Sequence, residues 1–161
     1  MKLCFAKAKG LIWLVFTAVV LITDLATKFY IHHTFYYGES VRLLNFFSIS
    51  YYRNTGAAFS ILEGQRWLLA AVAIIISLLI IYMLYKNGRT KKLESFSLAL
   101  VLGGALGNLF DRIYHGFVID FLDVNFGSWH YPTFNLADCA ICVGIVLFIF
   151  AGYNTRKEPK K

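Results

Sequence analysis

The chain has 161 residues, of which 58% are hydrophobic and only 16% are charged. A soluble domain normally carries about a quarter charged residues, and the apolar residues here are grouped into long blocks, which argues against a soluble enzyme. The net charge of +7 does not indicate a nucleic-acid partner, because the basic residues flank the apolar blocks and form no nucleic-acid motif.

Four apolar blocks approach the ~20 residues that a helix needs to cross a bilayer. They predict membrane spans at residues 11–31, 67–85, 95–113 and 136–153, joined on the outer side by segments 32–66 and 114–135 and followed by a basic cytoplasmic tail, 154–161. Little chain remains for a soluble domain, so we expect residues 1–161 to form a single membrane-embedded unit.

The basic residues predict how this unit is oriented. Eleven of the sixteen lysines and arginines precede the first span, lie between spans two and three, or follow the last span. By the positive-inside rule, both termini are then cytoplasmic. The first block also resembles a secretory signal peptide, but it continues past Asp24 and Lys28 without a clear cleavage site, so we expect a retained helix.

Each outer segment has its own pattern. Val41–Tyr52 is rich in aromatic and β-branched residues that partly alternate, which predicts short strands at the membrane interface. The tripeptide Asn54-Thr55-Gly56 predicts a turn. In the second segment Asp120 stands in an apolar run, and at its end Asn135 is typical of a helix N-cap, with Asp138 three residues later.

Span three contains Gly103, Gly104 and Gly107, which predict close packing of helices. A charge near the bilayer centre costs ~3 kcal/mol or more, so the charged residues of the spans need partners. Asp24 and Lys28 are four residues apart and can pair. Asp111 and Arg112 are expected to reach water at the outer end of span three, and a structural role is favoured for all four charges. No metal-ligand spacing is present.

Asp120 and Asp138 leave two interpretations open. Asp138 could be a carboxylate satisfied by the first turn of its helix, and Asp120 a loop residue on a short turn. If they meet in a partly dry space, the pair tends to hold one proton. The ionised member could then activate water, and the protonated member could donate to the oxyanion or the leaving amine of a peptide. Serine-hydrolase and zinc-protease motifs are absent from the sequence.

Five blocks together resemble the lipoprotein signal peptidase (signal peptidase II) family, in its order and spacing and over nearly the whole chain. The blocks are Asp24–Lys28, Asn54–Phe59, Gly103–Arg112, Val118–Phe121 and Phe134–Asp138. The resemblance implies an aspartate endopeptidase of the bacterial inner membrane that needs no cofactor. It would cut diacylglyceryl-modified prolipoproteins just before the lipidated cysteine.

The resemblance also implies a fold and a site. The fold is an all-α membrane protein of four transmembrane helices, with a small periplasmic β-cradle from Val41–Tyr52 and a second outer element from Tyr114–Trp129 over the active site. Asp120 and Asp138 would be the catalytic dyad at the periplasmic face, and Asp123 a decoy. Positions matching the substrate site are Asn54, Gly56, Asn108, Arg112, Asn135 and Ala137, supported by Asp24, Lys28 and Asp111. The expected partners are prolipoproteins and membrane lipids, and the chain is expected to be a monomer.

Three other classes compete with this hypothesis. A presenilin-like protease needs a G-x-G-D motif within a span, which the sequence lacks. A proton-coupled transporter would use intramembrane carboxylates, but near the midplane rather than at one surface. In a non-enzymatic assembly subunit, Asp24, Lys28 and Arg112 would serve only to hold helices together.

Overall fold

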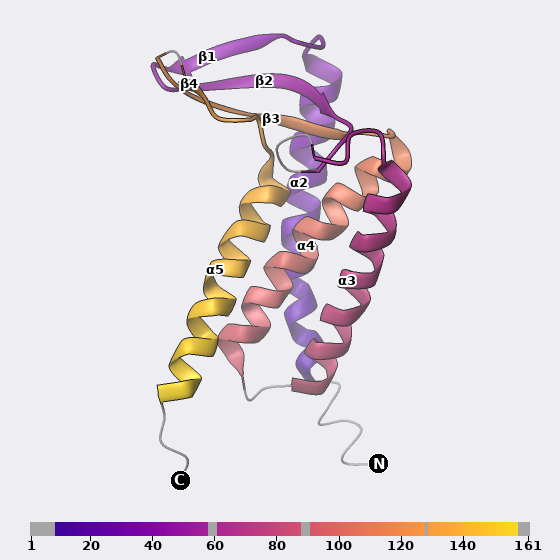
Figure 1. Cartoon of the computed structure of the whole chain (residues 1–161), viewed down its shortest axis with the longest axis vertical. Helices are drawn as coiled ribbons and strands as arrows, with labels where there is room; N and C mark the ends of the chain where they lie inside the picture. Colours follow the sequence, from indigo (N-terminus) through magenta and orange to yellow (C-terminus); the bar gives the residue numbers. More distant parts are fainter. Residues whose placement is uncertain (1–8, 58–60, 88–90, 128, 158–161) are drawn as a thin grey trace.

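The structure is a computed structural model that describes residues 9–57, 61–87, 91–127 and 129–157. The predictions that concern the basic residues before Lys9, Ala58 and Phe59 of the second block, and the tail beyond Lys157 fall outside these ranges. In the described part, four long helices stand side by side and carry a small sheet at one end (Figure 1).

The helices match the predicted spans closely. A short 3-10 turn, η1, leads into the first helix, and the elements are η1 (Lys9–Trp13), α2 (Leu14–Thr34), α3 (Arg66–Asn87), α4 (Lys92–Tyr114) and α5 (Leu136–Lys157). Each long helix contains an apolar stretch that is sufficient to cross a membrane. The apolar stretch of α5 ends at Tyr153, as predicted, and the helix itself continues to Lys157.

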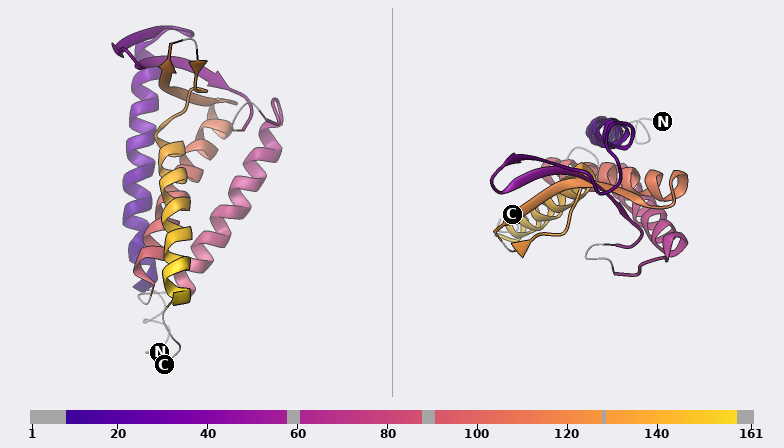
Figure 2. Two further views of the ribbon diagram at one scale, coloured as in Figure 1. Left: turned by 60° about the vertical axis from the view of Figure 1, so that its left-hand side comes forward. Right: turned by 90° about the horizontal axis from the view of Figure 1, so that it is seen from above.

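Helix α4 lies at the centre of the bundle and contacts α2, α3 and α5 (Figure 2). Within the most apolar 18 residues of α4, 61% are buried in the protein. In the corresponding stretches of the other helices only 17–22% are buried, so most of their side chains face outward. The glycines of α4 explain this packing. A Cβ on Gly103 would lie 2.7 Å from Val20 Cβ of α2, and one on Gly104 would clash with the carbonyl oxygen of Ala137 on α5. The prediction of close packing is confirmed.

The strands form one antiparallel sheet in the order β1-β2-β3-β4, with bounds β1 (Ser40–Leu44), β2 (Phe47–Asn54), β3 (Val118–Phe126) and β4 (Trp129–His130). The strands predicted in Val41–Tyr52 are therefore present. The second outer segment differs from the expected separate element: its strand β3 pairs with β2, so that Tyr52 lies opposite Asp120 and Asn54 opposite Val118. Both outer segments thus build a single sheet.

A small apolar core fastens the sheet to the end of the bundle. Ile31 of α2 packs with Tyr51 of β2 and with Ile119 and Phe121 of β3, and each of the four is at most 4% exposed. The first four residues of β3 are all buried, because one face of the strand meets this core and the other meets the ends of α4 and α5. Asp120 is one of these four buried residues.

Candidate active site

Asp120 lies within β3 and is 2% exposed. Its two carboxylate oxygens accept hydrogen bonds from two amide side chains: Asn54 Nδ2 donates to Oδ2 at 3.0 Å and Asn135 Nδ2 donates to Oδ1 at 2.7 Å. No ion pair of Asp120 is found among the described residues. The alternative of a loop residue on a short turn is wrong, because the pairing of β3 with β2 extends through this position.

Asp138 lies in the first turn of α5 and forms a reciprocal cap with Asn135. The backbone N–H of Asn135 donates to Asp138 Oδ2 at 3.2 Å, and the N–H of Asp138 donates to Asn135 Oδ1 at 3.0 Å. This is the geometry of a capping box, so the predicted N-cap is confirmed. The other oxygen of Asp138 accepts a hydrogen bond from Asn108 Nδ2 of α4 at 2.8 Å.

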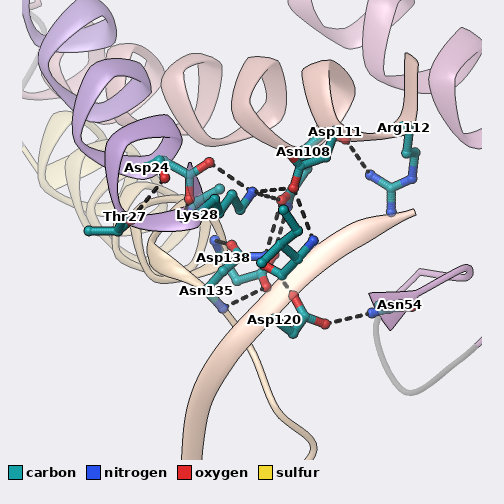
Figure 3. A network of polar contacts seen from close by, with 12 residues as sticks. Asp24, Thr27, Lys28, Asn54, Asn108, Asp111, Arg112, Asp120, Asn135 and Asp138 are labelled. Carbon is teal, nitrogen blue, oxygen red and sulfur yellow. Dashed lines mark hydrogen bonds and ion pairs between the residues drawn. The ribbon is translucent and has the colours of Figure 1, made fainter. Parts of the chain in front are cut away.

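Asn135 joins the two carboxylates. It is fully buried, caps α5 through its Oδ1, and directs its Nδ2 to Asp120 and, at 3.2 Å, to Asn108 Oδ1. Figure 3 shows both carboxylates beside Asn135, one carried by the sheet and one by the helix. The structure therefore brings together the two aspartates that the sequence singled out. We call Asp120 and Asp138 the dyad.

The dyad is arranged to hold a proton. Burial, and after it the nearby charge of Asp138, raise the pKa of Asp120 from its ordinary value of 3.8 to about 7. The hydrogen bonds from Asn54 and Asn135 act in the opposite direction. Near neutral pH the Asp120 carboxyl can thus either donate or accept a proton, which is the property that general acid–base catalysis requires.

The remaining acidic residues of the bundle surround one lysine. Lys28 Nζ lies 2.8 Å from Asp24 Oδ2 and 3.1 Å from Asp111 Oδ2, and all three side chains are at most 1% exposed. The expected pairing of Asp24 with Lys28 is confirmed. The expectation that Asp111 reaches water is wrong, because its side chain turns inward to Lys28. We call Asp24, Lys28 and Asp111 the Lys28 cluster.

Each carboxylate of the Lys28 cluster also binds an element that carries one dyad residue. Asp24 Oδ1 accepts a hydrogen bond from the N–H of Ala137 in α5 at 2.8 Å, and Asp111 Oδ2 accepts one from the N–H of Ile119 in β3 at 3.0 Å. Lys28 itself donates to Asn108 Oδ1 at 2.9 Å. The cluster therefore fixes the positions of both Asp120 and Asp138 without contacting either.

Arg112 performs a similar task for the turn after β2. Its guanidinium donates to the carbonyl oxygen of Gly56 at 2.8 Å and to that of Asn108 at 3.2 Å. The N–H of Gly56 in turn donates to Asn54 Oδ1 at 2.9 Å, which orients the Asn54 amide toward Asp120. The predicted turn is present, although its glycine does not adopt a positive φ.

Two other predicted residues, Asp123 and Ala137, remain to be placed. Asp123 is on β3, where Ser50 Oγ donates to it at 3.3 Å. The side chain of Ala137 is fully buried where α5 meets α4. The partners that the sequence missed are backbone groups, the N–H of Ile119 and the carbonyl of Gly56, and no side-chain pattern could have indicated them.

Known proteins resemble this chain over nearly its whole length. The sequence profile of the family described as signal peptidase (SPase) II matches residues 16–153. The chain is 47% identical to the lipoprotein signal peptidase of Escherichia fergusonii over 156 residues, covering 94% of this chain and 95% of that protein. It is 48% identical to the lipoprotein signal peptidase of Shigella flexneri, with the same coverage.

Solved structures agree in fold. One, described as a bacterial membrane enzyme at 2.3 Å resolution, matches with a TM-score of 0.85 and 32% identity, covering 92% of this chain and 93% of that one. Another bacterial membrane enzyme, at 1.9 Å resolution, matches with a TM-score of 0.78 and 34% identity, covering 86% and 90% of the two chains. Four helices able to span a membrane, together with bacterial relatives, make this a multi-pass bacterial membrane protein.

Proposed function

The chain belongs to the signal peptidase II family, and from that we infer that it removes signal peptides from prolipoproteins, with Asp120 and Asp138 as its catalytic dyad. One observation carries the assignment of the dyad. Two carboxylates from different elements converge on the buried residue Asn135, Asp120 on its side-chain amide and Asp138 on its backbone N–H, and neither is paired with a cation among the described residues.

The chemistry follows from one proton held by the two carboxyl groups. The ionised carboxylate takes a proton from water as the water oxygen attacks the scissile carbonyl, and the protonated carboxyl donates its proton to the carbonyl oxygen. When the tetrahedral intermediate collapses, the carboxyl that took the water proton donates it to the leaving amine. The other carboxylate takes the proton of the hydroxyl group that becomes the new carbonyl oxygen, so the pair regains its starting state. The raised pKa of Asp120 supports a dyad that carries this proton near neutral pH.

The site lies where such a substrate would present its scissile bond. Asp138 is in the first turn of a membrane-spanning helix, and Asp120 is on the sheet that covers that end of the bundle (Figure 1). A lipidated cysteine at the membrane surface would hold the peptide bond before it at this depth. We therefore propose cleavage just before a diacylglyceryl-modified cysteine, by an aspartic endopeptidase.

The arrangement supports three further proposals. The basic residues near the opposite end of the helices support cytoplasmic termini and a periplasmic sheet and active site in the inner membrane. We also propose that the chain acts as a monomer. Residues 1–161 would act as a single membrane-embedded peptidase domain. Membership of a peptidase family favours this function over the transporter and assembly-subunit hypotheses.

The test uses isosteric substitutions and a matched control. Asp120→Asn and Asp138→Asn should each abolish cleavage of a diacylglyceryl-modified prolipoprotein by the purified enzyme in detergent. Asp123→Asn, the same change three residues along β3, should cleave at the wild-type rate. All three proteins should show cooperative thermal unfolding. Normal turnover by a folded Asp120→Asn or Asp138→Asn variant would refute the dyad.

A further inference from the structure

A cavity separate from the dyad lies between the sheet-proximal ends of α2 and α4, with a volume of about 550 Å³. Neither dyad carboxylate lines it. It is lined by Leu25, Ala26, Lys28, Phe29, His32, His33, Phe110, Asp111, Tyr114, His115 and Ile119. Its size falls within the range of about 300–1,000 Å³ that is typical of ligand sites.

The lower wall of the cavity is apolar and opens toward the surroundings of the bundle. Leu25, Ala26 and Phe29 contribute from α2 and Phe110 from α4. Phe29 is 66% exposed and Phe110 is 44% exposed, so both rings face outward from helices that span the membrane. Hydrocarbon chains therefore have access to this wall, and they are the chemical group that it suits.

The upper rim of the cavity carries three imidazole rings. His32 and His33 are in the last turn of α2, and His115 follows the end of α4. The ring centroids of His32 and His115 lie 4.9 Å apart, and those of His32 and His33 lie 5.5 Å apart. The rings stand at the level where the helices end, which in a membrane is the level of lipid headgroups.

Hydrogen bonding favours one tautomer of His32. Arg53 Nε donates to the Tyr51 hydroxyl at 3.0 Å, so that hydroxyl is free to donate its own hydrogen to His32 Nδ1, which lies 2.6 Å away. Neutral His32 then carries its proton on Nε2, the nitrogen that is left for a ligand. His33 Nδ1 is similarly engaged, 2.9 Å from the carbonyl oxygen of Phe29.

The charged groups on the floor of the cavity do not compete for a ligand. Lys28 and Asp111 are paired with each other, and Lys28 also contacts Asp24 and Asn108. The cavity therefore offers imidazole donors above an apolar wall, beside the lipid. Phosphate and ester oxygens accept hydrogen bonds from such donors.

We propose that this cavity binds one glycerophospholipid of the surrounding leaflet, with an acyl chain along Ala26 and Phe29 and its phosphate at His32 and His115. A pocket between transmembrane helices that offers a few polar donors at headgroup depth above an apolar wall suits such a ligand. The proposal is independent of the dyad, which lies on the other side of β3 from Ile119.

Native mass spectrometry of the full chain, released from detergent in the presence of phosphatidylglycerol, tests the proposal. Wild type should retain one lipid under activation that strips the others. Ala26→Trp fills the apolar wall and should retain none. Ala18→Trp, also on the exposed surface of α2 but not lining the cavity, should retain one. His115→Phe keeps a ring but removes its nitrogens, and should weaken retention about fivefold, the equivalent of one hydrogen bond.

Two further probes distinguish a bound phospholipid from a lipid without phosphate and from a free anion. Diacylglycerol, which lacks phosphate, should be retained less well than phosphatidylglycerol; equal retention would overturn the role of the imidazole rim. Inorganic phosphate alone should not raise the unfolding temperature of delipidated protein, and an increase abolished by His115→Phe would identify a free-anion site instead. Retention of lipid by a folded Ala26→Trp variant would overturn the location.

Discussion

The Lys28 cluster and the dyad are built from the same acidic side chain and differ in what neutralises it. In the cluster two buried carboxylates share one lysine at 2.8 and 3.1 Å. In the dyad two carboxylates are held by asparagine amides and backbone N–H groups. A carboxylate paired with a lysine can support structure, whereas a carboxylate held by neutral donors can exchange a proton. The contrast assigns stability to one region and chemistry to the other.

Removing the cation of the Lys28 cluster should produce the largest change, a loss of stability. Lys28→Met would leave Asp24 and Asp111 buried without a counter-ion, and loss of one partner of a buried ion pair typically costs ~3–5 kcal/mol. We expect a large fall in unfolding temperature or no folded protein, measured by thermal unfolding in detergent. Stability close to wild type would show that the cluster is not the structural region.

Removing the Asp120 carboxylate, in contrast, should raise stability relative to wild type as the pH increases. The pKa of Asp120 is raised from 3.8 to about 7, so the folded state binds this proton more tightly than the unfolded state. The resulting stabilisation is complete below about pH 4 and is lost as the pH rises through about 7. Asp120→Asn does not titrate, so its stability relative to wild type should increase over this range, by at most ~4 kcal/mol.

The measurement is the unfolding temperature of both proteins from pH 4 to pH 8. The difference between Asp120→Asn and wild type should grow with pH, while Asp123→Asn should show no such trend. A constant difference across the range would mean that Asp120 titrates near its ordinary value, and the proton would then have to be carried elsewhere in the dyad.

Substitution of either asparagine that contacts Asp120 should have a smaller effect, and the two substitutions should differ in their effect on stability. Asn135→Ala removes the cap of α5, which costs ~1 kcal/mol, as well as the amide between the carboxylates. Asn54→Ala removes only a contact to Asp120 and the hydrogen bond to Gly56. We expect both to lower the rate of cleavage, and Asn135→Ala to lower the unfolding temperature more. Equal losses of stability would contradict the capping role.

Asp123→Asn should have the smallest effect. This carboxylate is on the same strand as Asp120 but accepts its recorded hydrogen bond from Ser50, away from the dyad. Substitutions of this kind usually change stability by less than ~0.5 kcal/mol. Cleavage rate and unfolding temperature should both match wild type, and a large loss of activity would extend the catalytic region along β3.

Much of the fold could be predicted because its signals are local. A membrane-spanning helix satisfies its own backbone, so an apolar block of sufficient length indicates one without reference to the rest of the chain. The cap at Asn135 and the pairing of Asp24 with Lys28 are also local, since they depend on spacings of three and four residues. The inward turn of Asp111 was predicted wrongly, because a position near a helix end does not reveal which neighbour the side chain meets.

The amino-acid sequence by itself determined the four spans, the close packing around the glycines of α4, and the two aspartates most suited to chemistry. Tertiary structure alone decided that β3 pairs with β2, which places Asp120 beside Asp138. It also decided that Asp24 and Asp111 each hold the backbone of a dyad element, and that three histidines meet above a cavity. These contacts join residues far apart in the chain, and their partners are often backbone groups, which are the same in every residue and carry no signal in sequence.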